Sequence, residues 1–199
     1  MSDSALNPSI EGGRRGFLRN AGLVFAGAGV VAATGLPALA ASSGDRKAAN
    51  HNSDISVLQG ALALEHEGIA AYTLAGGTGL LMPDVLKIAL NFLGHHKGHR
   101  DALANLIRKA GASPVQPKTD AEYTSELKLG DLKNQADVIT FAAGLEKGAA
   151  NAYVGQIAAL TDHELTHLFA QLSTDEAVHW AVLDSALGHA VPTAPFLFG

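Results

Sequence analysis

The sequence contains no cysteine, which excludes a disulfide framework and any metal site built on thiolates. It also lacks an excess of positive charge, since 14 Lys and Arg stand against 19 Asp and Glu, for a formal net charge of -5. Without a basic stripe to meet phosphates, nucleic acid is not expected as a partner. No segment alternates apolar and polar residues over the length of a half-buried strand. The fold must therefore rest on helix packing, and any metal site must use nitrogen and oxygen ligands.

Residues 1–40 differ in character from the rest and have the order of a targeting segment: a polar start, a basic cluster, an apolar run and a small-residue exit. The basic cluster at 13–19, GRRGFLR, resembles the twin-arginine export signal and departs from it only at Gly13, where Ser or Thr is usual. The apolar run at 21–33 is shorter than the roughly 20 residues that span a bilayer. The segment Ala38-Leu39-Ala40 then has the small-x-small pattern that signal peptidase accepts.

This resemblance implies export by the twin-arginine translocase, cleavage of residues 1–40 by signal peptidase, and a mature protein in the periplasm or otherwise exported, with no stable membrane span. An uncleaved N-terminal anchor is the alternative. The remaining 159 residues, 199 minus 40, suffice for one compact domain with its own core. We expect a flexible mature N-terminus at 41–52, the domain at 53–188 and a C-terminal tail at 189–199.

Four segments of that domain carry apolar residues at helical spacing. They span about 53–75, 83–110, 135–160 and 161–187. Pro83 suits the first position of a helix, Gly111 suits a left-handed C-terminal cap, and Thr161 with Glu164 suits a capping box. The links within each half are short, whereas the polar segment 112–132 between the halves is long enough to cross a bundle. The pattern predicts an all-α four-helix bundle of two hairpins, either ferritin-like or up-and-down in topology.

The two halves repeat each other. LEHEGIAAY at 64–72 matches LEKGAANAY at 145–153, so that Glu65 corresponds to Glu146, and His99 corresponds to His179 on the partner helices. Each glutamate lies on the apolar stripe of its helix. A buried carboxylate is costly unless a proton, a hydrogen-bonded partner or a cation compensates it, and a shared cause is needed for two such residues at matching places.

On the last helix, Glu176 and His179 are three residues apart and can reach a common point. With this motif the chain resembles the ferritin-like superfamily, in which two helices each supply one Glu and the other two each supply Glu-x-x-His. The resemblance implies a ferritin-like four-helix bundle with a metal site in its core. Carried over position by position, the implied ligands are Glu65, His99, Glu146, Glu176 and His179, and the sixth position, where Glu is expected, holds His96.

The substitution at position 96 bears on the kind of site. A carboxylate can bridge two metals, whereas a neutral imidazole binds only one. The ligand set could therefore hold one ion, or two with a solvent bridge, as in the manganese catalases, which the mix also resembles. A divalent metal is the expected cofactor, with iron or manganese favoured and zinc accepted by the same ligands. Dioxygen or peroxide would be the substrate; the alternative is a non-catalytic scaffold or stress-related envelope protein without metal.

Four further residues flank the predicted ligands. His95 is an alternative metal ligand, because it pairs with His99 at i, i+4 spacing. His66 follows Glu65 but turns away from its face, which allows at most an outer contact to the site. Tyr72 and Tyr153 lie two turns beyond the glutamates on the same stripes, where a core tyrosine with a satisfied hydroxyl is expected rather than a redox participant.

Overall fold

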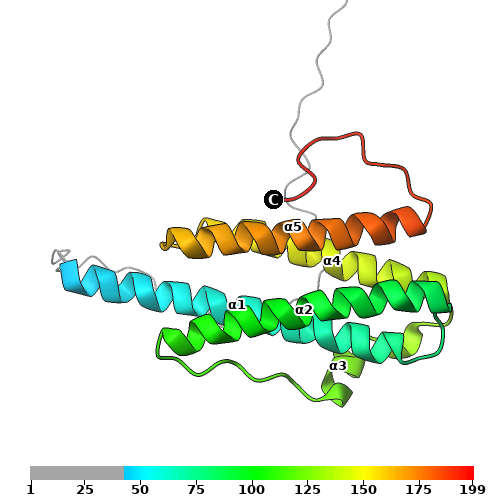
Figure 1. Ribbon diagram of the computed structural model, residues 1–199, viewed down its shortest axis with the longest axis horizontal. Helices are drawn as coiled ribbons and strands as arrows, with labels where there is room; N and C mark the ends of the chain where they lie inside the picture. Colours follow the sequence, from blue (N-terminus) through cyan, green and yellow to red (C-terminus); the bar gives the residue numbers. More distant parts are fainter. Residues whose placement is uncertain (1–42) are drawn as a thin grey trace, which may run out of the picture. The chain divides into compact units, whose positions relative to one another are not determined.

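The computed structural model describes residues 43–199 and is all-α over that range, which confirms the predicted fold class. Four long helices make the bundle (Figure 1). They are α1 (Ser43–Gly76), α2 (Pro83–Lys109), α4 (Gln135–Ile157) and α5 (His163–Ala186), with a short α3 (Asp120–Glu126) and a 3-10 turn η2 (Leu129–Asp131) in the link. The predicted export signal lies outside the described residues.

The bundle consists of two helical hairpins, α1 with α2 and α4 with α5, as the repeat in the sequence predicts (Figure 1). The turn within the first hairpin contains Gly79 at a φ of 77°, a left-handed conformation that glycine adopts without strain. Pro83 is the first residue of α2, and the N–H of Met82 before it donates to Gln135 Oε1 at 2.8 Å. This bond ties the start of α2 to the start of α4.

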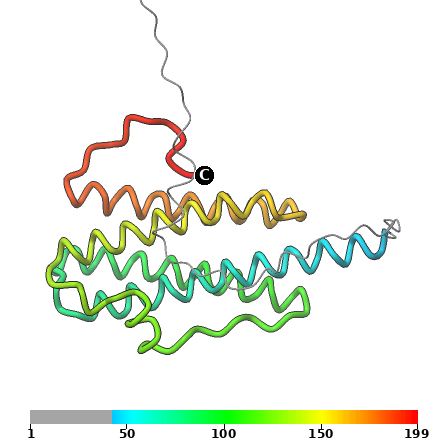
Figure 2. Tube along the Cα trace, turned by 180° about the vertical axis from the view of Figure 1, so that it is seen from behind, coloured from blue at the N-terminus to red at the C-terminus, as the bar shows by residue number. Residues whose placement is uncertain are grey.

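The long link between the hairpins runs along the outside of α1 and α2 (Figure 2). It leaves α2 through Gly111, whose φ of 81° confirms the predicted cap. Gln59 of α1 holds it by donating to the Ser113 carbonyl at 2.7 Å and accepting from the Val115 N–H at 2.8 Å. The link is more ordered than a polar stretch suggests, because Thr119 and the N3 residue Glu122 form a capping box that starts α3.

Two predicted helix starts are wrong. Helix α1 begins at Ser43, ten residues before the predicted start and inside the segment expected to be flexible; residues 43–53 are exposed and carry no apolar stripe that could have announced the helix. The N-cap of α5 is Asp162, whose carboxylate accepts from the N–H groups of its first turn, and not Thr161. The Thr161 N–H and hydroxyl both donate to Asp54 of α1, at 2.8 and 2.7 Å.

Two apolar clusters fill the bundle on either side of a polar middle layer. One, at the end of the bundle near the C-terminus of α2, contains Leu62, Leu103, Ile107, Phe169 and other residues that are almost fully buried. The other, toward the α1–α2 turn, contains Tyr72, Phe92, Ile139, Trp180 and Leu183. Burying one such leucine or phenylalanine contributes about 1.5–3 kcal/mol. The free energy gained by burying these apolar side chains therefore offsets the cost of burying the charged layer between them.

The C-terminal tail returns to the bundle after α5 (Figure 1). The Phe198 ring meets the Trp180 ring edge-on with centroids 5.4 Å apart, and the Gly199 N–H donates to Asn151 Oδ1 at 2.9 Å. Among the described residues, no helix is long and apolar enough to cross a membrane.

Candidate metal centre

The six residues predicted as metal ligands meet in the polar middle layer of the bundle. Each of the four long helices contributes: Glu65 from α1, His96 and His99 from α2, Glu146 from α4, and Glu176 and His179 from α5. The three glutamate side chains are at most 1% exposed, and the least buried member, His99, is 12% exposed. Three carboxylates are thus almost completely removed from water.

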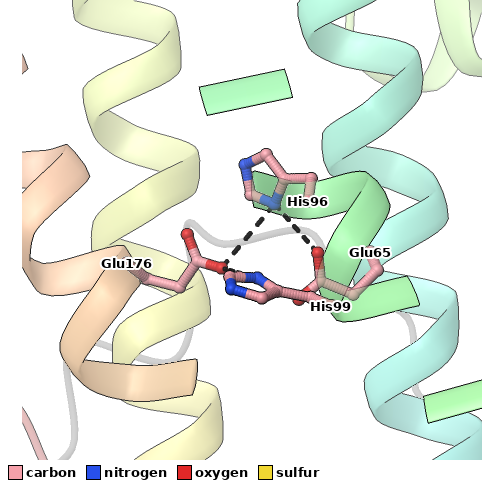
Figure 3. A group of neighbouring side chains, drawn as sticks. All are labelled: Glu65, His96, His99 and Glu176. Carbon is pink, nitrogen blue, oxygen red and sulfur yellow. Dashed lines mark hydrogen bonds and ion pairs between the residues drawn. The ribbon is translucent and has the colours of Figure 1, made fainter. Parts of the chain in front are cut away.

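One half of the cluster joins α1, α2 and α5 (Figure 3). His99 Nδ1 lies 3.4 Å from Glu65 Oε1 and 3.2 Å from Glu176 Oε1, and His96 Nδ1 lies 2.9 Å from Glu65 Oε2. One ligand atom from each of these four residues falls within 4.8 Å of the others. That is a set of four donors around one point.

The other half joins α2, α4 and α5. His179 Nδ1 lies 3.0 Å from Glu176 Oε2 and 3.4 Å from Glu146 Oε2, and His96 Nε2 lies 3.3 Å from Glu146 Oε1. The second set of four donors therefore shares Glu176 and His96 with the first. Each of the two sets has ligand atoms close enough together that it could hold a metal ion.

The tyrosines of the repeat connect the halves crosswise. Tyr72 of α1 donates its hydroxyl to Glu146 of α4, and Tyr153 of α4 donates its hydroxyl to Glu65 of α1. Glu65 and Glu146 thus each accept a hydrogen bond from the tyrosine of the other helical hairpin. Both phenols contact the cluster as donors to carboxylates.

The outward nitrogens of two histidines have their own partners. His99 Nε2 lies 3.1 Å from the Asp175 carboxylate, and His179 Nε2 lies 2.8 Å from His95 Nδ1. Such partners fix the ring orientation and the tautomer of a metal-ligating imidazole. His95 therefore lies outside the donor sets, behind His179. The sequence pattern did not predict a role for Asp175, although this residue directly precedes Glu176.

His66 is not part of the cluster. Its Nε2 lies 3.2 Å from the Val115 carbonyl oxygen, so this side chain holds the long link against α1. Burial lowers its pKa. The ring thus points away from the face of Glu65, toward the link.

Comparison with known proteins decides the family. A model of the ferritin-like domain matches residues 53–189. The chain belongs to the ferritin-like domain family. A crystal structure of a conserved hypothetical protein from Mycobacterium tuberculosis has the same fold, with a TM-score of 0.61 and 22% identity over 73% of this chain and 97% of that one. No curated protein matches in sequence.

The histidine at position 96, where the metal-binding pattern has Glu, is accommodated by a glycine on the neighbouring helix. A Cβ atom added at Gly68 would lie 3.1 Å from His96 Nδ1, closer than ordinary van der Waals contact. In the repeat, Gly68 of the first hairpin corresponds to Ala149 of the second. The glycine thus provides the space that the imidazole fills, one helical turn after Glu65.

Charges in the cluster are strongly coupled. Burial lowers the pKa of His96 and His99, but the glutamates outweigh it, through hydrogen bonds to His96 and through their negative charge beside both rings, and raise the pKa to about 11 for His96 and about 10 for His99. Burial raises the pKa of Glu65 and Glu146, but hydrogen bonds from the histidines outweigh it and lower both. For Glu176 burial prevails, and its pKa is raised. Without metal, these shifts favour the imidazolium form of His96 and His99 and the carboxylate form of Glu65 and Glu146.

The donors present fit a divalent metal. His99 Nδ1 and Glu176 Oε1 are buried and have no hydrogen-bond partner, although they lie 3.2 Å apart. Buried polar atoms of this kind normally have a partner. A cation between them would supply it, and nitrogen with carboxylate oxygen is a ligand set that iron, manganese and zinc accept.

Proposed function

We propose that this ferritin-like protein binds one or two divalent metal ions in its bundle core. Glu65 and His99 would hold an ion on one side, and Glu146 and His179 an ion on the other. Glu176 is placed to serve both. The observation that carries the proposal is the pair of overlapping donor sets, each of four residues with ligand atoms within 4.8 Å of one another, and all of them buried except the partly buried His99.

The occupancy of the two positions depends on His96. Its Nδ1 faces Glu65 and its Nε2 faces Glu146, so that the ring now lies between the two halves. A neutral imidazole offers one lone pair and cannot bridge as a carboxylate does. Two ions would therefore share only Glu176 and solvent. Because the His96 ring can bind just one of them, the two positions are expected to differ in metal affinity. Iron or manganese is the proposed metal, with zinc as a further fit.

The proposed chemistry is reaction with dioxygen or peroxide. A bound redox-active ion would supply electron transfer to the oxidant. The protein supplies the remaining parts: buried carboxylates that bind the ion, imidazoles oriented by Asp175 and His95, and phenols that hold Glu65 and Glu146 in place. Asp175 is 55% exposed, so this outer contact reaches solvent and gives protons a path to His99.

The proposed location is the periplasm or another exported compartment. The support is the segment 13–19 with its paired arginines, the short apolar run after it and the Ala38-Leu39-Ala40 exit. Twin-arginine export carries folded proteins, so a metal loaded in the cytoplasm would travel with the bundle. The translocase and signal peptidase would be partners during export only.

The first test is elemental analysis of the mature protein, purified from its own export route without chelators or a polyhistidine tag. The variant Glu146→Ala/His179→Ala removes one donor set. A matched control is Glu164→Ala/His167→Ala, which changes the same residue types at exposed positions of α5. Near-stoichiometric metal in the wild type and the control, reduced in the first variant, supports the site. Metal-free protein in all three, with the bundle folded, contradicts it.

A metal-free scaffold is the second candidate function, and the position of His96 favours it. The raised pKa of His96 favours its imidazolium form, whose single positive charge lies against both Glu65 and Glu146 and offsets part of their negative charge without an ion. A ferritin-like fold does not by itself fix function. The dependence of stability on pH separates the two candidates, because protons compete with a bound metal for the same donors.

A further inference from the structure

The bundle contains an apolar cavity of about 60 Å³ in the layer next to the metal centre. All four long helices line it, through residues that include Tyr72 and Ala75 of α1, Ile88 and Ala89 of α2, Ala142 of α4 and Val182 of α5. The lining is rich in alanine. The small side chains leave the space between the helices unfilled.

On every helix, the lining residue nearest to the cluster lies within about two helical turns of it. Ala142 precedes Glu146 by four residues, and Val182 follows His179 by three, which is about 4.5–6 Å along a helix axis. Tyr72 belongs to both sites, because its ring lines the cavity while its hydroxyl donates to Glu146. The Phe92 ring, packed on His179 with centroids 4.1 Å apart, contacts Tyr72 from the α2 side.

The lining determines which molecules the cavity can hold. Tyr72 is the only lining residue with a polar side chain, and its hydroxyl is already bonded to Glu146. A buried water needs two to four polar partners, and an apolar cavity without them stays dry. Hydrogen peroxide has the same need for partners. A cavity of about 150 Å³ holds benzene, so that this smaller one suits a molecule of two or three atoms.

We propose that this cavity is a binding site for dioxygen next to the metal centre. The inference rests on the proposed function and deepens it, since it selects dioxygen over peroxide as the substrate. Ile88 and Val182, 42% and 40% exposed, lie at the boundary between the cavity and solvent and form its entrance. Dioxygen enters between α2 and α5 and binds next to the Tyr72 ring. Asp175 lies on the opposite side of the cluster.

Xenon tests the cavity without any metal, because it is apolar and close to dioxygen in size. Crystals of the protein as purified, and of the same protein freed of metal, are pressurised with xenon. We expect a xenon atom between Tyr72 and Ala142 in both. Ala142→Leu fills the space and removes it, the milder Ala142→Val reduces its occupancy, and Ala136→Leu, at an exposed position of α4, leaves it unchanged. No xenon at this place in the wild type overturns the proposal.

The link to the metal centre is tested by loading iron(II) and following its oxidation by limiting dioxygen. Ala142→Leu should bind as much iron as the wild type and oxidise it several-fold more slowly, whereas its oxidation by hydrogen peroxide should be unchanged. Equal rates with dioxygen in wild type and variant overturn the proposal. If the wild type binds no iron or other metal at all, the proposed function fails instead, and the xenon result alone decides what the cavity holds.

Discussion

Tyr72 of α1 donates its hydroxyl to Glu146 of α4, so the carboxylate of one hairpin depends on the phenol of the other. In Tyr72→Phe that carboxylate loses a donor while staying buried. We expect the metal-free protein to lose about 1.5–3 kcal/mol of unfolding free energy, the contribution of a hydrogen bond to a charged group, while His96 and His179 still contact the carboxylate. The pKa of Glu146 should also rise, because the lost bond stabilises its charged form. Urea denaturation and NMR titration measure the two effects.

Tyr123→Phe is the matched control for this change. The Tyr123 hydroxyl accepts from the Lys118 N–H at 3.2 Å in the link and does not contact the cluster. Its removal should cost about 1 kcal/mol or less and leave the pKa of Glu146 unchanged. An equal loss of unfolding free energy in both variants, with no change in the pKa of Glu146, would show that the Tyr72 bond stabilises the cluster no more than the Tyr123 bond stabilises the link.

A second prediction concerns Gly68 and the space it leaves for His96. Gly148→Ala, at an exposed helical position with nothing within 4 Å of the new Cβ, should raise the unfolding free energy by about 0.5–1 kcal/mol. Gly68→Ala makes the same change to helix propensity, but its Cβ lies 3.1 Å from His96 Nδ1 and must displace the ring. We expect it to stabilise less than Gly148→Ala or to destabilise, and to weaken zinc binding measured by calorimetry. The same gain in both variants, with zinc binding intact, would contradict the steric role of Gly68.

Hydrophobic spacing predicted most of the bundle because each long helix has a buried stripe. Residues with a distinct backbone preference predicted some of the helix ends. Pro83 marks the start of α2, and Gly111 follows its C-terminal end. The start of α1 could not be found this way, since residues 43–53 have no buried face. At the start of α5, Thr161 and Asp162 are both good caps, and only the contact with Asp54 decides between them.

The buried Glu and His cluster could be predicted because a glutamate on an apolar stripe needs a compensating partner, and the repeat places such a glutamate in both halves of the sequence. What the sequence did not predict are relations across helices. Asp175 is one residue from Glu176, yet its role depends on His99 of another helix. The crossing of the two tyrosines likewise follows from how the hairpins face each other and not from the pattern of either one.

A third prediction follows from the bond between Asp175 and His99. Asp175→Ala removes the acceptor that orients the imidazole, and loss of such a partner typically weakens metal binding about 10–100-fold. Asp175→Asn keeps an acceptor without the charge and should fall between the wild type and the alanine variant. Asp184→Ala, on the same helix as Asp175, removes the partner of His189 in the C-terminal tail and should leave affinity unchanged. Competition with a chromogenic chelator measures the three dissociation constants, and equal values for Asp175→Ala and Asp184→Ala would contradict the orienting role.

The last prediction uses pH to distinguish the metal centre from the metal-free scaffold. In the metal-free protein the pKa of His96 is raised from 6.5 to about 11 and that of His99 to about 10. The folded state therefore binds more protons than the unfolded state in this range, and stability must fall as pH rises from about 7 to 10. With metal bound, protons compete with the ion for the same donors, so stability should rise with pH on the acid side up to neutrality.

Urea midpoints across this range, with and without a chelator, measure both trends. His167→Gln, at an exposed position, should leave both unchanged. A fall in stability above neutral pH that a chelator does not alter supports the scaffold, whereas an acid-side rise that the chelator abolishes supports the metal centre.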